Sequence, residues 1–458
     1  MYEQWIIALL VAPLVIAFES FALRGTKNRT VCTAFHITGL ILMLFFSVQV
    51  ISGVLEKGSI SAFNNWVYVD SLSAIFLGLI AVVGSLAGVY SIGYMNTELE
   101  EGHIDFKTYA HYHGFLHLFF FTMIVSVITN NLILMWVAIE STTLSSAFLV
   151  GTYKQKTSLE AAWKYIIICS VGVAFGLYGT LLTFANANGV LADPSQAIFW
   201  SAVNQQATGL NPMLMYIAFA FVLIGFGTKC GLFPMHTWLS DAHSEAPSPV
   251  SAILSAVLLN CAMLVVLRYY TLVSKAVGAE FPQTLMLIFG LLSVLVAALF
   301  IIVQFDIKRM LAYSSIENMG LISFAFGLGG PIGVFAGLLH TINHSLAKTL
   351  LFCASGNILL KYKTRDMNQV RGLWRVAPVS AVLFAGGALA LGGIPPFNVF
   401  VSEFSVVVAG ITAGKTWLVI LCLILLTIVL AGLALMLLKT VLGKQPDNVE
   451  AGEASKVT

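Results

Sequence analysis

Three ionisable side chains, His340, His344 and Lys348, lie four residues apart in the stretch GLLHTINHSLAKTLLF, residues 337–352. At 3.6 residues per helical turn, this spacing keeps all three on one face of a helix. Ionisable groups at membrane depth are costly, so a stripe of them in an apolar stretch indicates a function. Imidazole and ammonium groups placed in this way can pass protons along hydrogen-bonded water.

Two alternatives compete with a proton relay at this stripe. Histidines at i and i+4 can chelate a metal, but no acidic catalytic partner stands between His340 and His344. Packing in the core is a second alternative for His340. The six cysteines are scattered among apolar stretches without a CxxC pair, which is typical of small buried side chains. We therefore expect a relay, with no catalytic residue, no metal and no cofactor on this chain.

Other ionisable residues interrupt apolar stretches along the sequence. One alone could be half of an ion pair between two helices, but a series that alternates carboxylates and bases favours a proton or ion path. The predicted translocation residues are Glu140, Lys164, Lys229, His340, His344, Lys348 and Glu403, with Asp241, His243 and Glu317 as accessory candidates.

The composition indicates that transmembrane helices position these residues. Of 458 residues, 59% are hydrophobic and 10% are charged, whereas a soluble domain carries about 25% charged residues. The net charge of +2 gives no indication of nucleic-acid binding. The sequence thus predicts an all-α, polytopic membrane protein.

About 20 apolar residues are needed to cross a bilayer as a helix. On this criterion we expect about thirteen spans, at 5–23, 31–53, 70–95, 111–129, 131–152, 158–186, 210–233, 247–271, 281–304, 308–328, 332–360, 377–409 and 414–441. Lys57, Lys275 and Lys415 would lie on one side, and most other lysines and arginines would lie on the opposite side. The positive-inside rule then places the N-terminus outside and the C-terminus in the cytoplasm.

Helix breaks are expected next to two of the ionisable residues. Gly225, Gly227, Gly231 and Pro234 surround Lys229, and the motif GGIPP at 392–396 precedes Glu403. Glycine is permissive and proline removes a donor, and broken backbone is tolerated in a membrane only inside protein or along a cavity.

Ionisable positions also recur at an offset of about 175 residues, from Glu140 to Glu317 and from Lys229 to Glu403. This suggests two inverted five-helix repeats with one broken helix each. The expected organisation is three N-terminal helices at 1–110, repeats at 111–271 and 281–441, and a polar cytoplasmic tail at 442–458.

Several motifs carry a resemblance to a known family. They are WVAIESTTLSSAFLVG, SLEAAWKYIIICSVGVAFG, GFGTKCGLFPMHTWLSDAHSEAPSPVSA, DIKRMLAYSSIENMGL and HTINHSLAKTLLFCASGN. The chain resembles the antiporter-type proton-translocating membrane subunits of respiratory complex I, multisubunit sodium/proton antiporters and membrane-bound hydrogenases. Within that family it is most similar to the F membrane subunit of hydrogenase 4.

The resemblance implies roles for individual residues. Glu140 matches the family's fifth-helix glutamate, and Lys164 matches a sixth-helix base that pairs with it. Lys229 matches the lysine of a broken seventh helix. The His340, His344 and Lys348 stripe matches the eleventh helix, and Glu403 stands near the outward exit in a broken twelfth helix. Family members usually have a further C-terminal helix, where this sequence has its polar tail.

The function implied by the resemblance is proton translocation in a hydrogenase-4-type or complex I-like assembly of the prokaryotic inner membrane. The partners would be other membrane subunits and a peripheral redox arm, so any oxidoreductase activity would belong to the complex. A multisubunit sodium/proton antiporter without a redox partner is the alternative. A catalytic oxidoreductase chain is disfavoured, because the sequence has no cofactor motif and no soluble domain.

Overall fold

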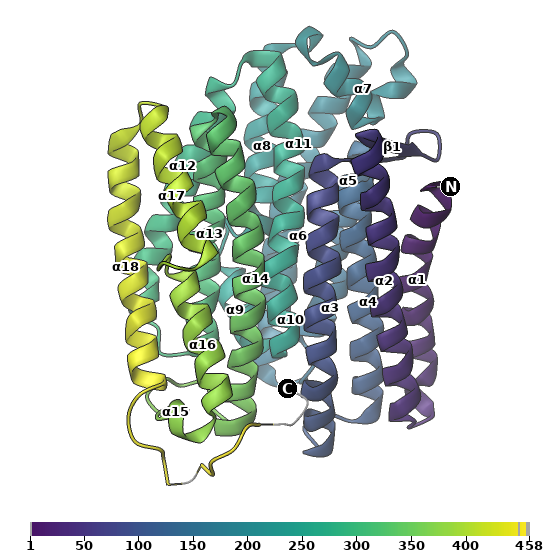
Figure 1. Cartoon of the computed structure of the whole chain (residues 1–458). Coiled ribbons are helices and arrows are strands. Elements are labelled where there is room, and N and C mark those ends of the chain that lie inside the picture. Colours follow the sequence, from purple (N-terminus) through teal and green to yellow (C-terminus); the bar gives the residue numbers. More distant parts are fainter. Residues whose placement is uncertain (1, 448, 455–458) are drawn as a thin grey trace. The chain divides into compact units, whose positions relative to one another are not determined.

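The computed structural model describes residues 2–447 and 449–454. Helices account for most of this part of the chain (Figure 1). Packing divides it into two compact units: residues 1–230 with 257–282, and residues 231–256 with 283–458. The first of these, unit 1, contains Glu140, Lys164 and Lys229, and the second, unit 2, contains the histidine stripe and Glu403.

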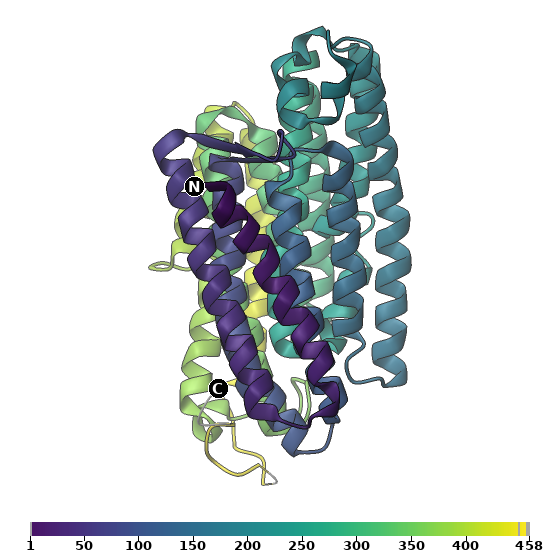
Figure 2. The ribbon, with the colours of Figure 1, turned by 90° about the vertical axis from the view of Figure 1, so that its right-hand side faces the viewer.

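Long helices make up most of unit 1, joined by short helical turns. They are α1 (Tyr2–Ala22), η1 (Leu23–Gly25), α2 (Arg29–Lys57), α3 (Ser71–Glu100), α4 (Phe106–Ile128), α5 (Leu132–Val150), α6 (Lys156–Asn188), η2 (Pro194–Ile198), α7 (Trp200–Gln205), η3 (Ala207–Gly209), α8 (Pro212–Cys230) and α11 (Leu259–Val277). Figure 2 shows α1 and α2 running side by side.

Asparagine or aspartate caps fix where several of these helices begin. The side chains of Asn28, Asp70, Asp105 and Asn131 accept hydrogen bonds from backbone N–H groups in the first turns of α2, α3, α4 and α5. A capped N-terminus satisfies donors that would otherwise be orphaned in an apolar setting.

A β-hairpin between α2 and α3 is the exception to the predicted all-α fold. Strands β1 (Ser59–Ala62) and β2 (Val67–Asp70) pair antiparallel, with Ser59 opposite Asp70. The turn Phe63–Asn65 takes positive φ values, which asparagine tolerates well. Alternating valine and aromatic residues after the turn explain why this short connection forms strands.

An ion pair connects the end of this hairpin to α11. Arg268 donates from both terminal nitrogens to Asp70, at 2.5 and 2.8 Å, and stacks over Trp200. Arg268 is almost fully buried, so the pair holds its charge inside unit 1. Neutralising either partner would leave an uncompensated buried charge.

The helices of unit 2 surround α14. They are α9 (Trp238–Glu245), α10 (Ser248–Ile253), most of α12 (Glu280–Ile301), α13 (Ile307–Leu328), α14 (Gly330–Tyr362), α15 (Leu373–Val376), α16 (Pro378–Leu391), α17 (Asn398–Thr412) and α18 (Thr416–Thr440). Helices α13, α16 and α17 pack directly on α14 (Figure 1).

All thirteen predicted ranges coincide with helix, and ten helical segments in the described residues are long and apolar enough to cross a membrane. The protein is therefore a multi-pass membrane protein. The count of thirteen is not confirmed, because α13 and α14 are not among those ten and α16 and α17 are shorter.

Both predicted helix breaks are present. Residues 231–237 separate α8 from α9, and 392–397 separate α16 from α17. The role predicted for Gly225 differs, however. It lies inside α8, where an added Cβ would come within 2.2 Å of the Gly176 backbone, so it permits close packing of α8 on α6. Gly231, with φ +76°, is the glycine at the break itself.

A third irregularity was not expected from the sequence. The predicted span 247–271 consists of α10, a π-helical turn η4 (Leu254–Leu258) and α11. A π-turn frees backbone carbonyls and commonly marks functional sites. Here the carbonyl of Ala256 accepts a hydrogen bond from Ser345 of α14 at 2.7 Å, within unit 2.

The two packing units do not follow the predicted repeat boundaries. Residues 231–256 belong to unit 2, because α9 packs on α13 and α10 packs on α14. The repeats themselves stay a prediction. In the predicted tail 442–458, the described residues form no helix, and residues 448 and 455–458 lie outside the described part.

Candidate functional site

Lys229 is fully buried in the last turn of α8. Its ammonium group donates to the hydroxyl of Thr143 on α5 at 2.7 Å and to that of Tyr165 on α6 at 2.6 Å. It also lies over the Tyr165 ring, 4.5 Å from the centroid. These partners are neutral, so they can hold the lysine in its charged or its neutral form. The C-terminal end of α8 favours the charged form.

Glu140 of α5 interacts electrostatically with Lys229 in unit 1. One carboxylate oxygen accepts a hydrogen bond from Ser170 at 2.6 Å. The other is buried without a hydrogen-bond partner within the described residues. An unpartnered carboxylate oxygen is costly in an apolar setting, and it is a position where a proton can bind.

Lys164 lies apart from this buried group. Its side chain is 49% exposed and pairs with Glu160, one turn earlier on α6, at 2.7 Å. The pairing of Lys164 with Glu140 that the family implies stays a prediction.

In unit 2, Lys348 is fully buried on α14. Its ammonium group donates to the carbonyl of Leu311 at 2.7 Å and to the hydroxyl of Ser314, both on α13. Lys348 and Lys229 thus share one type of environment, in which a fully buried ammonium donates to neutral oxygen atoms. This similarity was not visible in their sequence contexts.

His340, two turns before Lys348, bridges two neighbouring helices. Its Nε2 lies 3.0 Å from Asn318 Oδ1 on α13, and its Nδ1 lies 2.9 Å from Ser402 Oγ on α17. The amide oxygen can only accept, so Nε2 carries a proton. The Ser402 hydroxyl can donate to Nδ1 or to the Val399 carbonyl, 2.8 Å away. Rotation of one hydroxyl therefore lets His340 be neutral or charged.

His344 lies between these two residues and is fully buried, with no hydrogen-bond partner on either ring nitrogen within the described residues. It interacts electrostatically with Lys348, His340 and His243. Buried polar groups are nearly always hydrogen-bonded, so a buried imidazole without partners is a position where a water molecule or a proton would be stabilising.

Two carboxylates complete the group in unit 2. Glu317 of α13 is buried, accepts from the side chain of Asn318, and interacts electrostatically with Lys348 and Glu403. The Glu403 carboxylate lies directly on Gly393, where a Cβ would come within 2.0 Å of its Oε2. The break between α16 and α17 therefore provides the backbone surface on which Glu403 rests.

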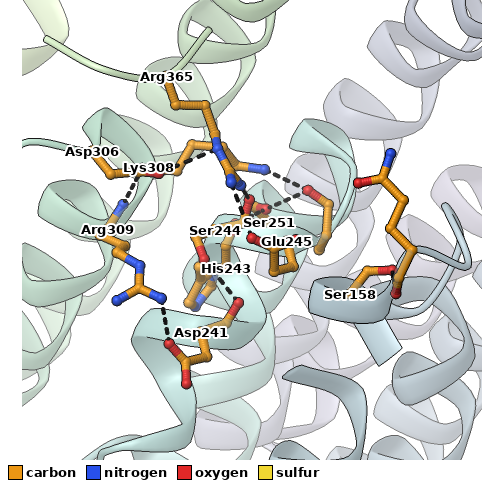
Figure 3. A network of polar contacts seen from close by, with 12 residues as sticks. Ser158, Asp241, His243, Ser244, Glu245, Ser251, Asp306, Lys308, Arg309 and Arg365 are labelled. Carbon is orange, nitrogen blue, oxygen red and sulfur yellow. Dashed lines mark hydrogen bonds and ion pairs between the residues drawn. The ribbon is translucent and has the colours of Figure 1, made fainter. Parts of the chain in front are cut away.

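The three accessory candidates are placed differently. Glu317 and His243 interact with the stripe, and the His243 ring stacks on Phe352 of α14 at 5.1 Å. Asp241 accepts instead from Arg309 at 2.7 Å. Figure 3 shows this pair within a network in which Arg365 also contacts Glu245 and Asp306, at 3.0 and 3.2 Å. These ion pairs attach α9 to α13.

Sequence reasoning missed the neutral residues that hold the ionisable ones. They are Thr143, Tyr165, Ser170, Ser314, Asn318 and Ser402. Serine, threonine and asparagine are frequent in membrane helices, where many bond to their own backbone, so type alone did not select them. Ser314 lies three residues before Glu317, a spacing that places both on one face of α13, and this spacing could have selected it.

No group of three or more His, Cys, Asp and Glu residues in the described part of the chain could hold a metal ion. The prediction that this chain carries no metal and no cofactor remains a prediction.

Comparison with known families identifies the class to which this fold and these residues belong. Residues 129–430 match the family described as NADH:quinone oxidoreductase/Mrp antiporter, TM. Residues 61–104 match the family of the N-terminus of complex I chain 5. The chain belongs to the NADH:quinone oxidoreductase/Mrp antiporter membrane-subunit family, and it is an antiporter-like membrane subunit.

Proteins named as components of hydrogenase 4 and of Na(+)/H(+) antiporters are similar in sequence to this chain. A hydrogenase-4 component F homolog of Methylacidiphilum infernorum is 43% identical over 74% of this chain and 71% of its own length. Hydrogenase-4 component B of Escherichia coli is 31% identical over 73% of the chain, and a Na(+)/H(+) antiporter subunit A1 of Staphylococcus aureus is 29% identical over 82%. The matched region spans about half of these two relatives, 49% and 47%.

Two solved structures share the fold. A chain of the membrane-bound sulfane sulfur reductase, an archaeal respiratory membrane complex, superposes with a TM-score of 0.86, covering 97% of this chain and 89% of its own at 24% identity. A chain of the Mrp complex from Dietzia sp. superposes with a TM-score of 0.82. The match covers 96% of this chain and 80% of that chain, at 21% sequence identity. The family model and the relatives confirm the expected family resemblance.

Proposed function

We propose that this chain translocates protons across a prokaryotic inner membrane as one subunit of a hydrogenase-4-type or complex I-like respiratory assembly. The observation that carries the proposal is that Lys229 and Lys348 are both fully buried and held by neutral acceptors. Desolvation favours the neutral form of such a lysine, whereas a nearby carboxylate favours the charged form. A change in the charge or position of the nearby carboxylate can therefore make each lysine bind or release a proton.

The residues suit a stepwise transfer in each unit. In unit 1, a change in the charge on Glu140 alters the electrostatic balance at Lys229, and Thr143 and Tyr165 accept from the ammonium in its charged form. In unit 2, the proton passes between Lys348, His344 and His340 and leaves through Glu403. The Ser402 hydroxyl rotates to match the charge on His340. No redox centre on this chain is needed.

The partners in this proposal are other membrane subunits and a peripheral redox arm that supplies the driving energy. The hydrogenase-4 relatives and the respiratory complex of similar fold support it. Lysines and arginines concentrated on one side of the predicted spans favour an N-terminus outside and a C-terminus in the cytoplasm.

A sodium/proton antiporter without a redox partner is the second candidate, favoured by the similarity to Na(+)/H(+) antiporter subunit A1. The stripe in unit 2 argues for protons as the moving ion there. Imidazole and ammonium nitrogens carry protons readily, whereas hard cations such as Ca²⁺ and Mg²⁺ select oxygen ligands, and we apply the same preference to Na⁺.

The moving ion can be determined with the purified complex in sealed lipid vesicles. An internal pH dye and radioactive sodium would be followed together after the redox reaction is started. We expect the pH inside the vesicles to change without a matching movement of sodium. Stoichiometric sodium flux in the absence of any redox partner would establish the antiporter instead.

A further inference from the structure

Three histidines of unit 1 form a second buried group that the proposed relay does not use. His36 lies on α2, and His113 and His117 lie on α4. Each side chain is at most 1% exposed. The His36 ring centroid is 4.5 Å from that of His113 and 5.0 Å from that of His117. We call these residues the histidine trio.

Hydrogen bonds determine where the protons of the trio lie. His36 Nε2 is 3.0 Å from the carbonyl of Gly88 on α3, which can only accept, so Nε2 carries a proton. In neutral His36, Nδ1 is then an acceptor, and it receives the proton of His117 Nε2 at 2.9 Å. His117 Nδ1 consequently carries a lone pair, and it is buried without a partner within the described residues.

His113 has no hydrogen-bond partner on either ring nitrogen in the same described part. Two isolated nitrogens and the His117 lone pair therefore occur within one packed group. Buried polar atoms are rarely left unpaired, so this group has the properties of a site that takes up a proton and ordered water.

A line of polar residues extends from the trio toward the start of α4. Tyr109, His113 and His117 are spaced by four residues on one face of α4, the spacing also found in the stripe of α14. The Tyr109 ring lies 4.7 Å from His113, and its hydroxyl is within 3.1 Å of Thr33 and Asn96. Beyond the other end, Phe120 and Leu40 are buried and apolar.

The titratable groups around the trio are few. Tyr109 and Tyr112 face His113 from α4, and Cys32 of α2 lies within electrostatic range of Tyr109. From α3 the neighbours are the Gly88 carbonyl and the Ser91 hydroxyl, which lies 3.5 Å from His36 Nε2. His113 and His117 interact electrostatically with the other imidazoles.

We propose that the histidine trio is a second proton-binding site, separate from Lys229 and connected to the start of α4 through Tyr109. A proton that binds His117 Nδ1 forms a new N–H bond there. The His117 Nε2–H bond breaks as an N–H bond forms at His36 Nδ1, so the positive charge moves to His36. The Gly88 carbonyl accepts from His36 in both states. Protonation of the trio is independent of the proposed function. Only the further statement, that the bound proton is one of those translocated, rests on the proposed function.

Solid-state ¹⁵N NMR of the full chain in lipid bilayers, with labelled histidine, tests the proposal. Between about pH 8 and about pH 5, where imidazoles titrate, we expect the pair His36–His117 to take up one proton, so that one of the two rings becomes doubly protonated. This signal should be lost in His117→Gln and in His36→Gln. It should remain in His111→Gln, a histidine of the same helix that lines an apolar pocket.

Two outcomes would overturn the inference. One is that the rings of His36 and His117 stay neutral through this range in protein whose circular dichroism spectrum is unchanged. The other is that the doubly protonated signal appears unchanged in His117→Gln. Proton translocation by Lys229→Ala in the same vesicles tests the proposed function separately, since that residue does not belong to the trio.

Discussion

At the residue scale, Lys229 and Lys348 resemble each other in having neutral hydroxyl or carbonyl partners. Because these acceptors are neutral, they can still bond to the amine after the lysine has released its proton. An arginine in the same position could not release a proton, because its guanidinium does not deprotonate in proteins. This difference separates a transport role from a packing role.

Lys348→Arg should therefore lower proton translocation by about tenfold or more while the complex assembles. Dye-based proton uptake by vesicles that contain the purified complex measures this. Lys361→Arg, in the last turn of the same helix, is the matched control and should pump normally. Normal pumping by Lys348→Arg would mean that Lys348 only contributes a fixed charge.

Glu140→Gln should reduce translocation strongly, whereas Glu140→Asp should keep part of it. A shorter carboxylate can still carry the charge that acts on Lys229, but an amide cannot. The rates of both variants, normalised to the amount of assembled complex, provide the comparison. If the Glu140→Gln complex translocates protons as fast as the wild type, Glu140 serves only to accept the hydrogen bond from Ser170.

At the element scale, the helix break at 392–397 positions Glu403. Gly393 has φ +65°, and its missing side chain leaves room for the carboxylate. Gly393→Ala should displace Glu403 and impose backbone strain of about 1 kcal/mol or more. We expect slower translocation and a lower midpoint of thermal unfolding in detergent.

Gly386→Ala, on α16, is the control for that variant. An added Cβ there meets nothing within 4 Å, and its φ is not in the left-handed region. It should leave both measurements unchanged or slightly raise the unfolding midpoint, since alanine favours a helix over glycine. Equal behaviour of the two variants would contradict the positioning role of Gly393.

The hairpin provides a pH-dependent element in unit 1. Burial raises the pKa of Asp70, but the hydrogen bonds and charge of Arg268 outweigh burial, so the pKa lies below its usual 3.8. A lowered pKa stabilises the folded state fully above pH 3.8, and this contribution is lost as the pH falls through the folded-state pKa.

Asp70→Asn should lower the free energy of unfolding by about 3 kcal/mol near neutral pH, because Arg268 stays buried without its partner. The difference from wild type should shrink below about pH 4. Thermal unfolding in detergent at several pH values checks both statements. The exposed cap Asp193 is a control whose loss should cost about 1 kcal/mol or less. A difference that persists unchanged at low pH would exclude the ion pair as the cause.

The helices could be predicted from hydropathy, because a bilayer requires long apolar segments and all thirteen ranges contain helix. The breaks could be predicted from glycine and proline. The π-turn at Leu254–Leu258 could not, since no glycine or proline marks it and tertiary hydrogen bonds hold it. The spacing rule that selected His340 and His344 would also have selected His113 and His117.

At the scale of the whole molecule, each packing unit contains a fully buried lysine that interacts with a carboxylate: Lys229 with Glu140 in unit 1, and Lys348 with Glu317 in unit 2. The proposed function needs both units within one larger assembly. Purification in mild detergent with identification of the accompanying chains should recover other membrane subunits and a redox arm. Recovery of antiporter subunits alone would favour the sodium/proton alternative.

The central claim is that protons cross the membrane through the buried lysines. The most direct measurement is proton translocation by the purified complex with Lys229→Ala in sealed vesicles, at confirmed assembly and with the redox reaction running. We expect that translocation driven through this subunit is lost. Translocation at the wild-type rate by the assembled Lys229→Ala complex would contradict it.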